Sequence, residues 1–141
     1  MILFWGAYLL MLLWGDSHAT HLVPGLEAAA NAQSFAIFPA VKPACIPTRT
    51  DARGLSGAER RCARFNAAVL AAVPALKADH RLAGVVIAAR WAEAGAWGGD
   101  LAANVRSLRA QNLPVLLVLD VPDFGYSLPR CVARKGIEAC R

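Results

Sequence analysis

The feature that most constrains the fold of this sequence is an apolar run that stops at four small or polar residues. Residues 8–14 (YLLMLLW) are apolar, Gly15-Asp16-Ser17-His18 follows, and a helix-compatible segment begins at once. A buried strand that turns into a helix displays the residue at its carboxyl end beside the free N–H groups of the first helical turn. Gly15 lets the backbone turn sharply without a Cβ clash. The pattern is a common way to display a nucleophile, here Ser17, although a serine at such a turn is more often an N-cap.

Apolar runs and helix-compatible segments continue to alternate along the chain. Short continuous apolar runs are typical of strands that are buried on both faces of a parallel sheet. We expect strands at residues 8–14, 34–40, 82–89 and 114–119, and helices at residues 19–30, 57–76 and 101–111. Ser56 and Glu59 form a capping-box pattern at the second helix, and Pro74 is expected to kink that helix or end it near Val73. The order predicts an α/β fold with a three-layer, doubly wound (flavodoxin-like) parallel sheet.

Length and composition limit the classes of function. The chain has 141 residues, of which 57% are hydrophobic and 18% are charged, so a single domain over residues 1–141 with a real core is expected. The formal net charge is +5, but no dense Lys/Arg run contains interleaved aromatic residues, so nucleic acid is not an expected partner. The charge is compatible with attraction to anionic glycans or to a membrane surface.

The four cysteines fall into two local pairs. Cys45 and Cys62 flank a polar loop, and Cys131 and Cys140 flank a short C-terminal loop. Three pairings are possible, of which the local one is the simplest. The sequence has no C-x-x-C and no histidine at ligand spacing, so a metal site is not expected. Disulfides predict an oxidising compartment, which is the periplasm or the cell exterior.

The two ends of the chain are interpreted separately. Residues 1–14 are almost wholly apolar, but they are shorter than the ~20 residues of a membrane-spanning helix. They also have no basic n-region and no small-residue cleavage site. We interpret residues 8–14 as the first strand and residues 1–7 as an apolar stub, because cleavage after the run would remove the strand that presents Ser17. From Asp120 onward the pattern predicts loop, and residues 121–141 are expected to form a disulfide-containing tail.

The stretch Gly15-Asp16-Ser17-His18 resembles the first sequence block of the SGNH (GDSL-type) hydrolase superfamily, in its GDSH form. Other features are similar, in order, to the SGNH domain that bacteria fuse behind membrane acyltransferase domains, which O-acetylate surface polysaccharides. These features are Trp14 to Ala19, Cys45, Cys62, Phe65-Asn66, the strand end Ala88-Ala89-Arg90-Trp91, and Pro129 with Cys131. The resemblance implies an SGNH-hydrolase-like fold and chemistry through an ester of Ser17.

The resemblance also implies roles for individual residues. Ser17 is expected to be the catalytic nucleophile, and Gly15, Asp16 and His18 are expected to form the supporting turn. His18 is adjacent to Ser17 in the chain, so its side chain is expected to point elsewhere and to give structural support rather than to act as the base.

Two further groups of residues follow the central and last strands. Arg90 and Trp91 stand where many SGNH enzymes place an oxyanion-hole asparagine, at an edge where open α/β sheets bind ligands, and we expect both to line the pocket. For Trp91, a core aromatic residue at a strand end is an equally weighted alternative. Asn66 matches the family pattern, but the sequence assigns it no catalytic role. Asp120 and Asp123 follow the last strand, where they could stand near the site, although aspartates that form turns are the more common explanation.

The reaction implied by the resemblance is transfer of an acetyl group from an acyl donor, through Ser17, to a polysaccharide acceptor. No cofactor is expected, and a membrane acyltransferase domain is the expected partner of a periplasmic or extracytoplasmic, membrane-associated protein. SGNH enzymes carry their Asp and base His in a C-terminal D-x-x-H block, which this sequence lacks. We therefore expect a domain that is missing its C-terminal part. The alternatives are a plain SGNH esterase that uses water, and a non-catalytic glycan-binding remnant of the fold.

Overall fold

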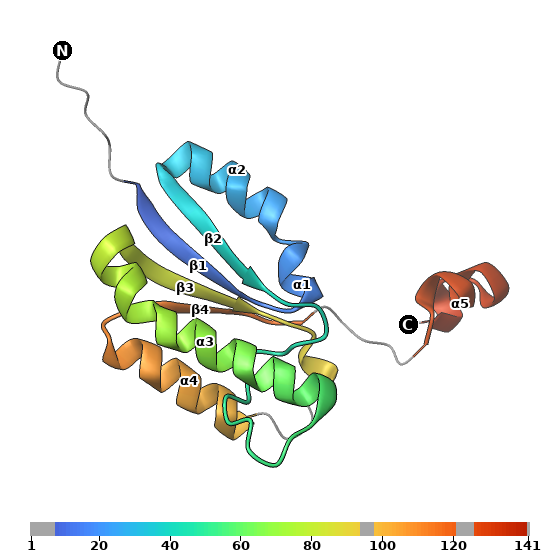
Figure 1. The fold of residues 1–141 in the computed structure, drawn as a ribbon. Helices are drawn as coiled ribbons and strands as arrows, with labels where there is room; N and C mark the ends of the chain where they lie inside the picture. Colours follow the sequence, from blue (N-terminus) through green and yellow to red (C-terminus); the bar gives the residue numbers. More distant parts are fainter. Residues whose placement is uncertain (1–7, 94–97, 121–125, 141) are drawn as a thin grey trace.

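Four parallel strands form the centre of the part of the molecule that the structure describes (Figure 1). The structure is a computed structural model and describes residues 8–93, 98–120 and 126–140. The strands are β1 (Leu9–Gly15), β2 (Phe35–Val41), β3 (Leu82–Ala88) and β4 (Val115–Val118), in the spatial order β2-β1-β3-β4. Gly15 at the end of β1 pairs with Val41 on one side and with Ala88 on the other. The carboxyl ends of these strands therefore meet at one edge of the sheet.

Helices cover both faces of this sheet. The helices α1 (Ser17–Thr20) and α2 (Val23–Gln33) lie on one face, and α3 (Gly57–His80) and α4 (Gly98–Ala110) lie on the other. The remaining elements of the described residues are the 3-10 turns η1 (Trp91–Glu93) and η2 (Glu138–Cys140) and the helix α5 (Leu128–Lys135). The predicted α/β fold, with a doubly wound parallel sheet between two helical layers, is confirmed.

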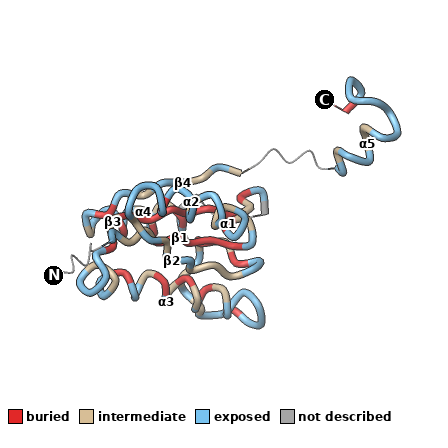
Figure 2. Tube along the Cα trace, turned by 90° about the horizontal axis from the view of Figure 1, so that it is seen from above, coloured by how far each residue is buried: buried red, intermediate tan, exposed pale blue. Residues whose placement is uncertain are grey.

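Successive side chains of the inner strands point into two separate halves of the core. Those that pack toward α3 and α4 are Leu12, Trp14, Val85 and Ile87. Those that pack toward α1 and α2 are Leu13, Val86 and Ala88. All seven are 4% exposed or less, as expected for strands covered on both faces. Figure 2 shows the same concentration of buried residues along the strands and the inward sides of the helices.

Two predicted helices have different bounds in the structure. The segment expected to form one helix over residues 19–30 forms two, because α1 ends at a turn and α2 begins with Pro24 in its first turn, where proline is well tolerated. The helix expected over residues 57–76, with a kink or an end at Pro74, continues through Pro74 to His80. It ends where Arg81 adopts a left-handed conformation with φ 54°, and the Arg81 N–H donates to the carbonyl of Leu76.

Two other expectations from the sequence were wrong. Ser56 does occupy the N-cap position of α3, but its side chain makes no capping hydrogen bond, so the predicted capping box does not form. The chain beyond Asp120 was expected to be loop, and it contains the helix α5 and the turn η2. The expected stub at residues 1–7 lies outside the described residues.

Both disulfides form as predicted, Cys45–Cys62 and Cys131–Cys140. The second closes a small C-terminal unit in which α5 packs on η2 and the Tyr126 hydroxyl donates to the carbonyl of Cys140 at 3.0 Å. Figures 1 and 2 show this unit apart from the sheet. None of the helices in the described part of the chain is long and apolar enough to span a bilayer.

The strand β4 lies at one edge of the sheet in the described structure and exposes large apolar side chains. Leu116 is 59% exposed and Leu119, just beyond the strand, is 78% exposed. Among the described strands, β4 pairs only with β3. One long side of β4 is therefore left without a neighbouring strand in this part of the molecule.

The first prediction concerns the two disulfides. Replacing Cys45 and Cys62 by alanine should lower the free energy of unfolding by about 3 kcal/mol, because this bond closes a loop over a sequence separation of 17. The matched control is the double alanine variant of Cys131 and Cys140. It should leave the unfolding of the sheet unchanged in urea titrations, because that bond links α5 only to η2. Equal losses in both variants would contradict the division into a sheet unit and a C-terminal unit.

Candidate active site

Ser17 lies where the carboxyl end of β1 turns into α1. It is the first residue of α1, and its side chain is exposed. Within residues 8–93, 98–120 and 126–140, the Ser17 hydroxyl has no hydrogen-bond partner. The N-cap of α1 is Asp16, so the alternative interpretation of Ser17 as an N-cap is wrong. The serine is therefore an exposed hydroxyl at the first position of α1, next to the N-cap Asp16.

Gly15 allows three elements to meet under Ser17. A Cβ atom built on Gly15 would lie 1.8 Å from the carbonyl oxygen of Ala88 and 2.6 Å from the Cβ of Ala19. Both neighbours belong to secondary structure, β3 and α1, so neither can move aside cheaply. Gly15 was predicted to allow a turn without a Cβ clash. In the structure the clash that it avoids is with β3 and α1, which both lie close to the end of β1.

Asp16 is a buried carboxylate that joins the start of α1 to the loop after β3. It is 3% exposed. Its Oδ1 accepts a hydrogen bond from the His18 N–H at 2.8 Å, and its Oδ2 accepts one from the Arg90 N–H at 3.0 Å. Hydrogen bonds from N–H groups to an ionised acceptor are stronger than those between neutral groups. Asp16 therefore fixes the turn that carries Ser17 relative to the central strand.

Asp120 forms a second bridge between the same two segments. Its Oδ1 lies 3.5 Å from His18 Nδ1, and its Oδ2 accepts a hydrogen bond from the Ala92 N–H at 3.3 Å. Of the two interpretations of Asp120, a turn residue or a residue near the site, the structure supports the second. Its contact with His18 joins residues that are 102 positions apart in the sequence. Asp123 lies outside the described residues.

The two bridges hold His18 at its backbone and at its ring. Because Nδ1 faces the carboxylate of Asp120, Nε2 is the ring nitrogen that remains available. The ring also stacks on His21, with centroids 6.1 Å apart and planes 10° apart. Two imidazoles and a carboxylate therefore lie beside Ser17 at this edge.

Arg90 and Trp91 follow β3 and connect its end to two other strand ends, Arg90 to the end of β1 and Trp91 to the end of β4. The Trp91 ring is 7% exposed, and its Nε1 donates to the carbonyl of Val118 at 2.7 Å. Arg90 is half-buried and donates its N–H to Asp16. The pocket-lining role expected for these two residues stays a prediction.

A second part of this edge is the loop of residues 45–49, here called the loop platform, which lies between β2 and α3. The Nδ2 group of buried Asn66 donates to the carbonyls of Ile46 at 2.9 Å and Arg49 at 3.1 Å. The Nδ2 group of Asn104, 5% exposed, donates to those of Pro47 and Thr48 at 3.2 and 2.7 Å. Two amides on two helices therefore bind four consecutive carbonyls.

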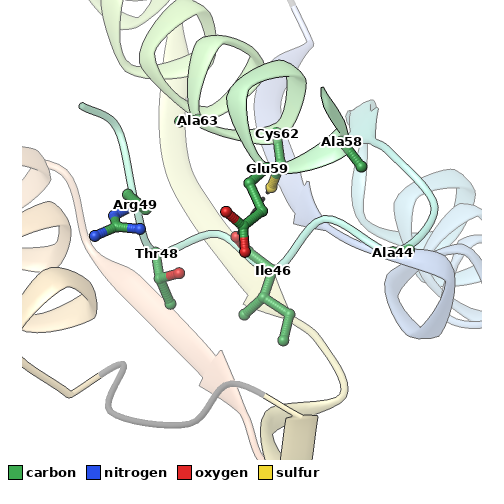
Figure 3. A pocket seen from close by; sticks show the side chains of 8 residues that line it. All are labelled: Ala44, Ile46, Thr48, Arg49, Ala58, Glu59, Cys62 and Ala63. Atoms are coloured by element: carbon green, nitrogen blue, oxygen red, sulfur yellow. Dashed lines mark hydrogen bonds between the residues drawn. The ribbon is translucent and has the colours of Figure 1, made fainter. Parts of the chain in front are cut away.

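Asn66 also connects the loop platform to the first strand. Its Oδ1 accepts a hydrogen bond from Trp14 Nε1 at 3.1 Å, and the disulfide Cys45–Cys62 begins one turn earlier on α3. A shallow pocket of about 250 Å³ lies between the platform and the start of α3. Figure 3 shows the side chains of Glu59 and Cys62 extending from α3 toward the loop that carries Ile46 and Thr48.

A charged pair stands just beyond the platform. The Arg53 side chain donates to both oxygens of Asp51 at 2.7–3.0 Å. These hydrogen bonds lower the pKa of the Asp51 carboxyl to about 2 and raise the pKa of Arg53. Both side chains are solvent-exposed, so the pair neutralises local charge and contributes little to stability. No group of three or more His, Cys, Asp or Glu side chains in the described ranges is arranged to hold a metal ion.

The second prediction tests the close approach at Gly15. Gly15→Ala should lower the free energy of unfolding by more than about 3 kcal/mol, because its Cβ would overlap the backbone of β3. Gly25→Ala is the control: Gly25 is in α2 and has nothing within 4 Å of its Cβ position. This change should stabilise the protein by about 0.5–1 kcal/mol. Denaturant titration of both variants measures the two values, and a tolerated Gly15→Ala would refute the close approach.

The third prediction concerns the tautomer of His18. In alkaline buffer, where imidazoles are neutral, the His18 ring should carry its proton on Nδ1, because that nitrogen faces the carboxylate of Asp120. Long-range ¹H–¹⁵N correlation spectra distinguish the two tautomers. Asp120→Ala should remove the preference, whereas the exposed His80 at the end of α3 should give the same spectrum in both proteins. A proton on Nε2 of His18 in the unmodified chain would show that Asp120 does not orient the ring.

Comparison with known proteins gives one result that bears on this geometry. No curated protein and no solved structure matches the chain. The model of the family described as "SGNH domain (fused to AT3 domains)" matches residues 6–141, which is nearly the whole sequence. This range contains the turn at Ser17, both aspartate bridges and the loop platform. The chain therefore belongs to the family of SGNH domains that are fused to AT3 domains.

Proposed function

We propose that this domain is an O-acyltransferase in which Ser17 carries the acyl group. The observation that carries the proposal is the position of Ser17: an exposed, unpaired hydroxyl among the described residues, on a fixed turn at the carboxyl edge of the sheet. Open α/β sheets bind their ligands at this edge. Membership of a family fused to AT3 domains supports a role in acyl transfer.

The proposed reaction has two steps. In the first, Ser17 Oγ attacks the carbonyl carbon of an acetyl donor, the bond from that carbon to the donor's leaving group breaks, and the serine proton goes to a base. In the second, a sugar hydroxyl of a cell-envelope polysaccharide attacks the acetyl carbon, the bond to Oγ breaks, and Oγ regains a proton. In this proposal the oxyanion of both steps is stabilised by backbone N–H groups near Ser17 other than that of His18, which is donated to Asp16.

Gly15, Asp16 and His18 support the serine in this proposal. Gly15 permits the close packing under the turn, and Asp16 fixes the turn to the loop at Arg90. His18 and His21 are the imidazoles near Ser17 in the chain, and His80 lies at the far end of α3. The proposed location is outside the cytoplasm, in the periplasm and beside a membrane acyltransferase domain. The two disulfides, which are typical of oxidising compartments, support this location.

The fourth prediction tests the nucleophile. Incubation of the purified chain with p-nitrophenyl acetate should release p-nitrophenol and leave one acetyl group on Ser17, detected by peptide mass spectrometry. Ser17→Ala should reduce the release at least about a hundredfold and abolish the label, because no other residue replaces the attacking oxygen. Ser107→Ala, at an exposed position on α4, is the matched control and should behave as the unmodified chain. An unlabelled Ser17 would refute the proposal.

The same assay separates the transferase from its alternatives. A labelled chain that loses its acetyl group only when a polysaccharide is added is a transferase, whereas rapid loss to water identifies an esterase. Variants His18→Gln, His21→Gln and His80→Gln then identify which imidazole, if any, receives the serine proton. A chain that binds glycan without acquiring a label is a non-catalytic binding domain.

A further inference from the structure

Three arginines on α3 form a row on its outward surface, here called the arginine ridge: Arg60, Arg61 and Arg64. All three are exposed. The opposite face of the helix carries Ala63, Asn66, Val69 and Val73, which are buried. The ridge therefore faces solvent along the first two turns of the longest helix in the described structure.

The ridge is electrostatically unfavourable for the helix that carries it. Arg61 and Arg64 are three residues apart and Arg60 and Arg64 are four apart, so their like charges are neighbours on the helix surface. They also lie near the helix N-terminus, whose partial positive charge repels cations. The acidic residue in the first turn is Glu59, which is not three or four residues from any of them.

The described structure supplies no acidic partner for these charges. The Arg60 Nε group donates to the carbonyl of Leu55 at 2.6 Å, and neither Arg61 nor Arg64 has an ion pair or side-chain hydrogen bond within the described ranges. Nearby, Arg53 is neutralised by Asp51. The ridge is therefore a net positive surface that can bind an external anion without first breaking an internal ion pair.

The position of the ridge connects it to the candidate active site. Figure 1 shows the start of α3 at the same end of the molecule as the carboxyl ends of the strands and α1. The helix is held there by the disulfide Cys45–Cys62 and by the hydrogen bonds of Asn66 to the loop platform. The ridge and the turn at Ser17 therefore lie at the same end of the molecule, on opposite faces of the sheet. A polymer that contacts both passes around this end.

The chemistry of the ridge favours a glycan over a lipid surface as its partner. Surfaces that insert into membranes combine cations with exposed large apolar side chains. In the described residues, the exposed large apolar side chains are on β1, β2, the end of β4 and the C-terminal unit, and none is on α3. Arginine forms paired hydrogen bonds to carboxylate and phosphate groups, which fits acidic groups repeated along a polymer.

We propose that the arginine ridge binds the acidic groups of an anionic polysaccharide, and that the acceptor of this domain is therefore an acidic glycan. The assignment of the glycan as acceptor rests on the function proposed above. The binding of the glycan to the ridge does not, and the two are tested separately.

The fifth prediction compares two double variants of equal charge. The purified chain, the ridge variant Arg61→Gln/Arg64→Gln and the control variant Arg106→Gln/Arg109→Gln are titrated with polygalacturonate and with neutral dextran by calorimetry. Arg106 and Arg109 are exposed on the last turns of α4, at the opposite end of the strands. We expect the ridge variant to bind polygalacturonate about tenfold more weakly than the control variant, with dextran bound by neither, because two charge-assisted contacts are lost.

Several outcomes would overturn the proposal. One is equal weakening of polygalacturonate binding in both double variants. Others are no binding of polygalacturonate by the unmodified chain, or binding of dextran as tight as that of polygalacturonate. A further one is a ridge variant that loses binding to vesicles of phosphatidylglycerol and phosphatidylcholine while it keeps polygalacturonate binding, which would assign the ridge to a membrane.

Two controls separate this proposal from the catalytic one and from misfolding. Ser17→Ala should bind polygalacturonate as tightly as the unmodified chain, and the ridge variant should acquire the Ser17 acetyl label from p-nitrophenyl acetate normally. If no acetyl label forms in any of the proteins, the catalytic proposal fails. The titrations with polygalacturonate still show whether the ridge binds an acidic glycan. The melting temperature of the ridge variant should not fall, because like-charge repulsion is removed, and a marked fall would mean that the arginines are structural.

Discussion

The candidate site depends on a buried carboxylate, Asp16, that receives one N–H from each of two segments. The His18 N–H comes from the start of α1, and the Arg90 N–H comes from the loop after β3. An alanine at this position would leave two buried donors without partners, which costs more than the hydrogen bonds themselves contribute. Asp120 repeats the arrangement from the end of β4, with the His18 ring and the Ala92 N–H as its two contacts. Three strand ends are thus joined through one histidine and the three-residue loop that begins at Arg90.

Local patterns were sufficient to predict the fold. Apolar runs identified all four strands, and their alternation with helices predicted the parallel sheet between two helical layers. Cysteine spacing indicated both disulfides. Element ends were less predictable, because they depend on tertiary contacts: α3 tolerates Pro74 where its neighbours pack on the sheet, and the cap expected from Ser56 was not needed.

The site was predictable only where it is local in sequence. Gly15, Asp16 and Ser17 are adjacent, so a turn pattern identified them. Asp120 and His18 are 102 residues apart in the sequence, and Asn104 is at least 56 residues from the carbonyls that it binds in the loop platform. Patterns of residue spacing do not predict contacts at such separations. Burial of Asn66 was predictable from the sequence, because this polar residue lies on the apolar face of an amphipathic helix, between Ala63 and Val69. A buried amide at such a position must find partners, which here are the backbone carbonyls of a loop.

The exposed side of β4 has a consequence for how this chain behaves in concentrated solution. A strand edge with unpaired backbone groups and apolar side chains such as Leu116 is a template on which another extended segment can add. The tetrapeptide Val115–Val118 contains no charged residue and no proline to prevent such addition. Self-association through this edge would leave Ser17 and the arginine ridge accessible, because they belong to β1's end and to α3. Aggregates formed in this way can therefore still present Ser17 and the arginine ridge to solvent.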